Sequence, residues 1–120
     1  ARVRAPVDLT DVVPTVMDAL GQRPRFPVHG ESLLPHLLLD APLRVPEAFA
    51  EIRLPYARLQ AWRSGDRKVI LDHQTGAASA FDLSTDPLER APTPASEELL
   101  GEVGRWIDVH LAAPAISRDR

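Results

Sequence analysis

Histidine and aspartate are the residues of this 120-residue chain whose types support metal binding or acid–base chemistry. Asp72 and His73 are adjacent, and His29 and His36 lie seven residues apart. A metal site needs a third ligand and a set of partners that orient the first ligands. We therefore favour structural roles for His29 and His36. For Asp72–His73 we favour a solvated turn, because the pair stands at the end of a predicted strand. A small metal-dependent enzyme using these residues stays open as an alternative.

Close carboxylates are also the groups that a general acid–base pair uses. Asp8 and Asp11 stand three residues apart at the start of a predicted helix, where free backbone N–H groups need acceptors, so capping is the favoured role. Glu51 and Arg53 share one face of a predicted strand and are expected to pair or to face water. His110 is expected to pack, half-buried, at the edge of an apolar helix stripe.

Several classes of function find no support in the composition. The absence of cysteine excludes disulfides, thiolate metal sites and cysteine nucleophiles. The 14 basic and 17 acidic residues give a net charge of -3, which indicates neither nucleic acid nor an anionic membrane as a partner. No apolar run reaches the roughly 18 residues of a membrane span. Neither a Ser-His-Asp order nor a glycine-rich phosphate loop occurs.

The first predicted element is a helix over residues 11–20. Its apolar side chains recur at helical spacing, and Thr10 or Asp11 suits the N-cap. Gly21 suits the left-handed position that follows a last helical turn. One face of this helix is expected to be buried, and it consists of Val13, Val16, Met17 and Leu20.

A short helix is predicted at about residues 32–39. Ser32 is its expected cap, and Pro35 falls in the first turn, where a missing N–H costs little. Together with the first helix it forms a helical lead-in segment, residues 1–46.

Residues 47–120 change character and predict a β-meander followed by a helix. Turn signals at 64–67 and 74–76 separate runs of strand-forming residues, and such short turns force neighbouring strands to be antiparallel. The run Lys68–Asp72 is rich in Val, Ile and Leu, which favours a central position in the sheet. Four strands are predicted, at residues 48–53, 57–63, 68–72 and 78–83.

The last predicted element is a helix. Ser96 is its expected cap, and the two acidic residues after Ser96 suit the first helical turn. Pro114 is expected to end it. Trp62 and Trp106 are expected to anchor the core between sheet and helix. The fold class is therefore α+β, a small four-stranded antiparallel sheet packed against a C-terminal helix. The helix stripe expected to cross the sheet consists of Leu99, Val103, Trp106, Ile107 and His110 or Leu111.

Five ordered segments resemble the C-terminal region of the sulfatase family, which belongs to the alkaline-phosphatase-like superfamily of hydrolases. Val7–Gly21 contains an Asp-x-x-Pro-Thr core, and Val28–Leu37 resembles Gly-x-Ser-Leu-Leu-Pro-x-Leu. Ala48–Glu51 matches a family strand, and Arg63–Ile70 resembles Arg-x-Gly-x-Trp-Lys-Leu-Ile. Phe81–Glu89 resembles Tyr-Asp-Leu-x-x-Asp-Pro-x-Glu. The resemblance covers about residues 3–111.

The resemblance implies chemistry that lies outside this chain. Sulfatases use a formylglycine made within Cys/Ser-x-Pro-x-Arg and a divalent cation, usually calcium, held by paired acidic residues. Both motifs lie upstream of this region in the family, and this chain contains neither. The departures from the family pattern concern the subfamily. They are Arg67 in place of Trp, Phe81 in place of Tyr, His29 before the glycine, and Ala91–Thr93 in place of Asn-Leu.

The sequence therefore predicts a non-catalytic C-terminal fragment of a sulfatase, a sulfuric ester hydrolase. Its first helix leads in from a missing catalytic domain, and Ala1–Pro6 is interpreted as a cut end. The expected partner is that upstream domain, which the fragment buttresses, with a possible share in its substrate rim. Catalytic, cofactor-binding and metal-binding residues are all predicted to be absent from these 120 residues; the parent is expected to need calcium and formylglycine.

Two other functions stay open. The chain is alternatively a free-standing binding or regulatory module with the same fold, or the tail of a related phosphonate or phosphate monoester hydrolase. When the chain is isolated, an exposed apolar helix face is expected to drive homodimerisation. Neither the compartment nor the substrate is predicted.

Overall fold

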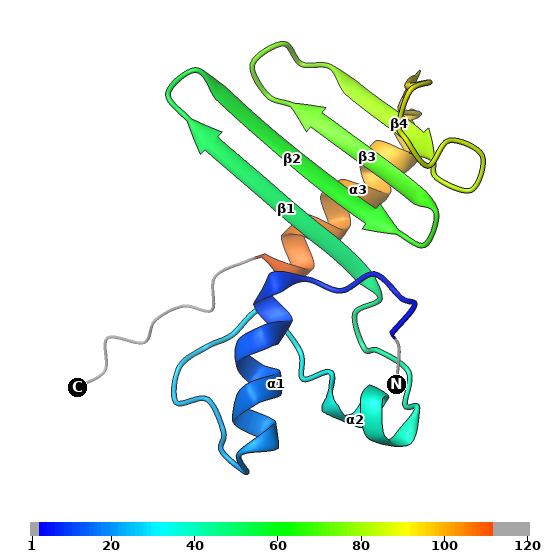
Figure 1. Ribbon diagram of the computed structural model, residues 1–120. Helices are drawn as coiled ribbons and strands as arrows, with labels where there is room; N and C mark the ends of the chain where they lie inside the picture. The colour runs from blue at the N-terminus through cyan, green and yellow to red at the C-terminus, as the bar shows by residue number, and fades with distance from the viewer. Residues whose placement is uncertain (1–2, 112–120) are drawn as a thin grey trace.

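The computed structural model describes residues 3–111 (Figure 1). Within this range the chain forms three α-helices, one 3₁₀ turn and five β-strands. No helix among these residues combines the length and the apolar character needed to cross a membrane. The expected helix end at Pro114 lies outside the described residues, and the observed helix ends earlier, at His110.

The lead-in segment begins with the 3₁₀ turn η1, Leu9–Asp11, which continues into α1, Val12–Ala19. Asp8 caps η1 by accepting a hydrogen bond from the Thr10 N–H, and the Asp11 carboxylate accepts one from the Asp8 N–H at 2.9 Å. This reciprocal capping box confirms the capping role of both aspartates. Gly21 has φ +67°, which confirms its left-handed position after the helix.

The apolar face of α1 is not buried by the rest of this chain, and its exposure agrees with the expectation for the isolated chain. Val13, Val16 and Leu20 are 48%, 53% and 70% exposed, and Pro14 is the buried residue of the helix. The main neighbours of α1 are η1 and the short helix α2, and neither covers this face. A helical stripe shows that a helix has an apolar face, but the face is buried only where a partner lies against it.

The short helix α2 spans Leu34–Leu39, so it begins two residues later than predicted. Its N-cap is Leu33, which provides no capping side chain. The Ser32 hydroxyl instead accepts from the Leu34 N–H at 3.2 Å and donates to the Asp18 carboxylate at 2.6 Å. Ser32 therefore joins α2 to α1 from outside the cap position.

Five strands form one antiparallel meander in the order of the sequence. The four predicted strands are confirmed within one residue at each end, and β3 lies in the middle of the sheet as expected. The fifth strand, a two-residue pairing with β4, was not among the predicted strands. The strands are β1 Glu47–Leu54, β2 Ala57–Ser64, β3 Arg67–Asp72, β4 Ala78–Asp82 and β5 Thr93–Pro94.

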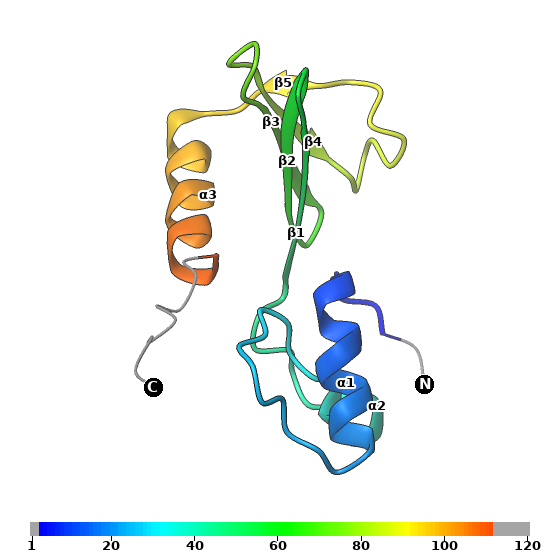
Figure 2. The ribbon, with the colours of Figure 1, turned by 90° about the vertical axis from the view of Figure 1, so that its left-hand side faces the viewer.

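The last helix, α3, spans Glu97–His110 and begins as predicted, with the Ser96 hydroxyl accepting from the Leu99 N–H at 3.2 Å. It lies across one face of the sheet, while α1 and α2 lie beyond one end of the sheet (Figure 2). The core between sheet and α3 is small. Its fully buried apolar side chains, among the residues described, are Trp62, Val69 and Val103.

Candidate functional site

The adjacent pair Asp72–His73 divides into two roles. Asp72 Oδ1 accepts from the backbone N–H groups of Gln74 at 2.9 Å and Thr75 at 3.2 Å, in the turn between β3 and β4. These hydrogen bonds hold the pKa of Asp72 below its usual value. His73 Nε2 lies 2.7 Å from Gln60 Oε1 on the sheet, a contact that sequence reasoning missed. The turn role is thus confirmed for both residues, and His73 makes its contact with Gln60 from an exposed turn position.

His29 and His36 lie in different hollows. His29 lines a cavity of about 80 Å³ between the lead-in segment and the sheet, and His110 lines the same cavity. His36 borders a separate hollow beside α2, and its Nδ1 lies 2.6 Å from the Ala41 carbonyl oxygen. Nowhere in residues 3–111 do three His, Cys, Asp or Glu side chains gather so that they could hold a metal ion. The calcium that the sulfatase resemblance implies therefore has no fitting ligand set in the described part of the chain.

The carboxylates of Asp8 and Asp11 join segments that are distant in sequence. Asp8 Oδ2 accepts from the Phe49 N–H at 3.0 Å, and Asp11 Oδ1 accepts from the Glu31 N–H at 2.9 Å. Asp11 is 9% exposed. Asp8 therefore holds the lead-in segment against β1, and Asp11 joins two parts of the lead-in segment to each other.

Two of the sequence motifs contact each other in the folded chain. Thr15 Oγ1 of the Asp-x-x-Pro-Thr motif accepts from the Leu33 N–H at 2.9 Å. Gly30 of the Gly-x-Ser motif packs so closely on the first motif that an added Cβ would lie 2.0 Å from the Thr10 carbonyl oxygen. We call the contact of these two motifs, residues 10–18 and 30–33, the lead-in joint. The sequence showed both motifs but did not predict that they would be in contact.

Two later motifs meet in the same way. Lys68 of the β3 motif forms an ion pair with Glu89 of the Asp-Pro-x-Glu motif, with an N···O distance of 2.6 Å. The carboxylate of Asp86 accepts from the backbone N–H groups of Arg90 and Ala91, each at 2.9 Å, and so shapes the turn that places Glu89. These motif residues therefore hold the turn after β4 against the sheet.

The aromatic residues of the core behave as predicted. Trp62 is 2% exposed, and Trp106 packs at the margin of the core. The Trp106 ring lies 5.8 Å from the Phe49 ring and stacks on the His110 ring at 4.6 Å. Half-buried packing is therefore confirmed for His110. Arg67, which replaces the tryptophan of the family pattern, lies 5.6 Å over the Trp62 ring.

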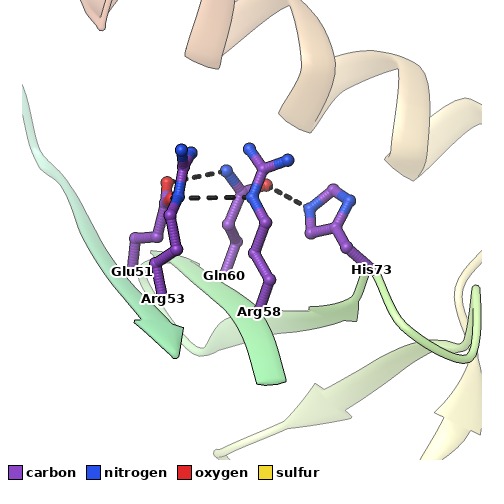
Figure 3. A network of polar contacts seen from close by, with 5 residues as sticks. All are labelled: Glu51, Arg53, Arg58, Gln60 and His73. Carbon is purple, nitrogen blue, oxygen red and sulfur yellow. Dashed lines mark hydrogen bonds and ion pairs between the residues drawn. The ribbon is translucent and has the colours of Figure 1, made fainter. Parts of the chain in front are cut away.

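A polar network occupies the α3 side of the sheet, next to the apolar core (Figure 3). Arg53 donates twice to Glu51 Oε1, at 3.0 and 3.2 Å, so the predicted pairing of these two residues is confirmed. Gln60 donates from Nε2 to Glu51 Oε2 at 2.9 Å, and His73 lies on its other side. Arg58 Nε is 3.6 Å from Glu51 Oε1. The Gln60 hydrogen bond is the main cause that lowers the pKa of Glu51, with Arg53 and Arg58 adding to it.

The opposite face of the sheet carries no helix; it is apolar over most of β1 and β2 and carries Arg63 and Lys68 toward one end. Side chains alternate along strands, so the neighbours of the core residues point away from α3. Ile52, Leu54 and Leu59 on this face are 49%, 40% and 36% exposed. We define the uncovered sheet face as the side chains of Ala48, Ala50, Ile52, Leu54, Leu59, Ala61 and Ile70.

The uncovered sheet face continues toward the lead-in segment. A hollow of about 450 Å³ lies between Val7 and Leu9 of that segment and Ala48, Ala50 and Ala61 of the sheet. Helix α1 lies on the same side, opposite α3 (Figure 2). We call the uncovered sheet face, this hollow, the exposed valines of α1 and the Leu20 that follows the helix together the open apolar surface.

Comparison with known proteins agrees with this architecture at the level of the fold. No family model and no curated protein matches the chain. One solved structure that is similar is described as a putative sulfatase from Bacteroides thetaiotaomicron VPI-5482. The two share 20% sequence identity with a TM-score of 0.62, over 84% of this chain. The match covers only 24% of the other protein, so this chain corresponds to about a quarter of its length.

Proposed function

We propose that this chain is the non-catalytic C-terminal domain of a sulfatase, a hydrolase of sulfate esters, and that it buttresses the catalytic domain. The observation that carries the proposal is the open apolar surface. Exposed apolar patches of this kind mark interaction sites in soluble proteins. The five ordered motifs and the fold shared with part of a sulfatase-like protein support the same assignment.

The residues present in this chain assign the chemistry to the catalytic domain and a supporting role to this chain. The chain has no cysteine, no Ser-x-Pro-x-Arg and no Asp-Asp pair, so it supplies neither a formylglycine precursor nor the paired acids of the family metal site. Calcium, when bound to the parent, would act as a Lewis acid on the sulfate group. The residues of this chain hold the lead-in joint and present the open apolar surface to the catalytic domain.

Burial of the open apolar surface would provide the affinity. Each Å² of apolar area removed from water contributes about 25 cal/mol, and fully burying one valine or leucine contributes about 1.5–3 kcal/mol. The exposed residues of this surface include Leu9 at 87%, Val12 at 52% and Val16 at 53%. A few such side chains provide enough free energy to hold a domain in place without any cross-link.

A docking experiment tests the proposal. The chain is mixed with the domain encoded immediately upstream in the same gene, and the dissociation constant is measured by calorimetry. We expect Val16→Glu on α1 to weaken binding at least tenfold, because it buries a charge in an apolar contact. Val109→Glu is the matched control, since Val109 is a 74% exposed helical valine on α3. Equal affinities of both variants and the wild type would contradict the proposed surface.

An activity measurement tests the non-catalytic assignment separately. The isolated chain is incubated with calcium and a chromogenic sulfate ester. We expect no turnover above the rate in buffer, while the full-length parent turns the ester over. Turnover by the isolated chain would overturn the assignment. A gene whose upstream region lacks Cys/Ser-x-Pro-x-Arg would favour a free-standing binding module.

A further inference from the structure

Arg53 and Arg58 form a cross-strand pair of like charges. They are direct partners in the register of the β1–β2 hairpin, and both side chains lie on the α3 side of the sheet (Figure 3). Like charges directly opposite each other destabilise a hairpin. The acid that contacts both arginines is Glu51, 3.0 Å from Arg53 and 3.6 Å from Arg58. One carboxylate shared by two guanidinium groups leaves an excess positive charge at this point.

Partly buried hydrogen bonds hold this carboxylate in place. An ionised carboxylate only accepts, so Gln60 must turn its Nε2 toward Glu51 and its Oε1 toward His73. His73 Nε2 therefore carries the hydrogen and donates to Gln60. Gln60 is 6% exposed, which fixes the relay from His73 through Gln60 to Glu51. The nearly buried Gln60 thus holds Glu51 within reach of both arginines.

The two guanidinium groups keep unused donors. Each has five N–H groups, and Arg53 uses two of them on a single oxygen of Glu51. Arg58 Nε is shielded from solvent and makes no hydrogen bond in the described structure. The side chains are 68% and 43% exposed, so their outer N–H groups are accessible. Paired guanidinium forks match the geometry of carboxylate and sulfate oxygens.

We propose that Arg53 and Arg58 bind an oxyanion, a sulfate or carboxylate group, and that Glu51, Gln60 and His73 position them. The arginine pair lies on the opposite side of the sheet from the open apolar surface, so it stays accessible when that surface is covered. Its ligand is a soluble anion or a sulfated sugar. The anion site itself is independent of the proposed function. Its use in holding a multiply charged sulfate ester rests on that function.

A titration of the 120-residue chain tests the site. The arginine Nε–H and histidine ring signals are followed by NMR while sodium sulfate, sodium acetate or glucose 6-sulfate replaces sodium chloride at constant ionic strength. We expect a saturable shift of the Arg58 and His73 signals at millimolar concentration. Arg58→Gln should weaken it at least tenfold, and Arg58→Lys should weaken it less, because it keeps the charge but loses the fork.

The control is Arg63→Gln, which removes the same charge from the same strand on the opposite face. Arg63 Nε donates to the Gly65 carbonyl and takes no part in the network. Arg63→Gln should bind as the wild type does. Saturable binding of glucose 6-sulfate identifies a sulfated ligand, and binding of inorganic sulfate or acetate alone identifies a free ion. Linear shifts, or equal shifts in the Arg58→Gln and Arg63→Gln variants, would overturn the site without affecting the docking proposal.

Discussion

At the scale of single residues, several polar side chains connect segments that are distant in sequence. Asp11 and Thr15 each accept a backbone hydrogen bond from the segment that carries Gly30, and Asp8 accepts one from the first strand. These bonds replace water for groups that are partly buried, and losing one partner leaves the other unsatisfied. The lead-in joint therefore depends on close backbone approach as much as on charge.

Gly30 is the most sensitive position of the lead-in joint. An added Cβ would lie 2.0 Å from the Thr10 carbonyl oxygen and 2.6 Å from the Asp11 nitrogen, so the backbone must move. We expect Gly30→Ala to lower the free energy of unfolding by about 1–3 kcal/mol, as overpacking typically does. Urea denaturation followed by circular dichroism measures the change.

Gly104→Ala provides the matched control for this measurement. Gly104 lies inside α3, and nothing stands within 4 Å of its added Cβ. Alanine is the better helix former by about 0.5–1 kcal/mol, so this substitution should stabilise the chain. Equal effects of the two substitutions would show that the close contact at Gly30 is not limiting.

Carboxylates with lowered pKa values predict the pH dependence of stability. The Ser84 hydroxyl and N–H groups lower the pKa of Asp82 from 3.8, and Arg67 lowers the pKa of Glu102 from 4.5. Each contribution to stability is fully present above the unfolded-state value and is lost as pH falls through the folded-state value. The urea midpoint should therefore fall as pH drops from about 5 to 3.

The variant Asp82→Asn separates this effect from the general response to acid. It removes a titrating carboxylate, so the fall of the midpoint in this pH window should become shallower. Asp108→Asn removes an exposed carboxylate from α3 and is the comparison for the loss of one charge. If both variants keep the slope of the wild type, the hydrogen bonds at Asp82 do not contribute as expected.

At the scale of elements, the sequence predicted local patterns well and partners poorly. The strand ends were predicted within one residue because Gly65 and Gly76 mark turns, and both adopt the positive φ that such turns require. The pairing of Thr93–Pro94 with β4 was missed because proline is unfavourable in most strands. Strand ends depend on residues close by in the sequence. The β4–β5 pairing depends instead on how the segment after β4 folds back against that strand.

The difference between local patterns and distant partners also explains which residues around the arginine pair were not predicted. Glu51 and Arg53 were predicted to pair because they stand two residues apart on one strand. Arg58 and Gln60 join them through hairpin register, and His73 joins through the next turn. Alternation of side chains predicts which residues share a strand face, but a network across three segments needs the register and the turn geometry as well.

At the scale of the whole molecule, the chain has a core on one side only. The side chains of Trp62, Val69 and Val103 are buried between sheet and α3, while valines and leucines remain exposed on the other side. A helix and a sheet each need a second layer to bury their apolar faces. The open apolar surface is the place where that layer is absent from the described chain.

The open apolar surface also predicts how the isolated chain behaves in solution. Without its partner, the chain can shield this surface by pairing with a second copy. We expect sedimentation velocity to show a monomer–dimer equilibrium at micromolar to millimolar concentration. Val16→Glu should shift the equilibrium to monomer, and Val109→Glu, on α3, should leave it unchanged. Since dimerisation and docking would use the same residues, adding the upstream domain should dissociate the dimer; a ternary complex would show that the two contacts occupy different surfaces.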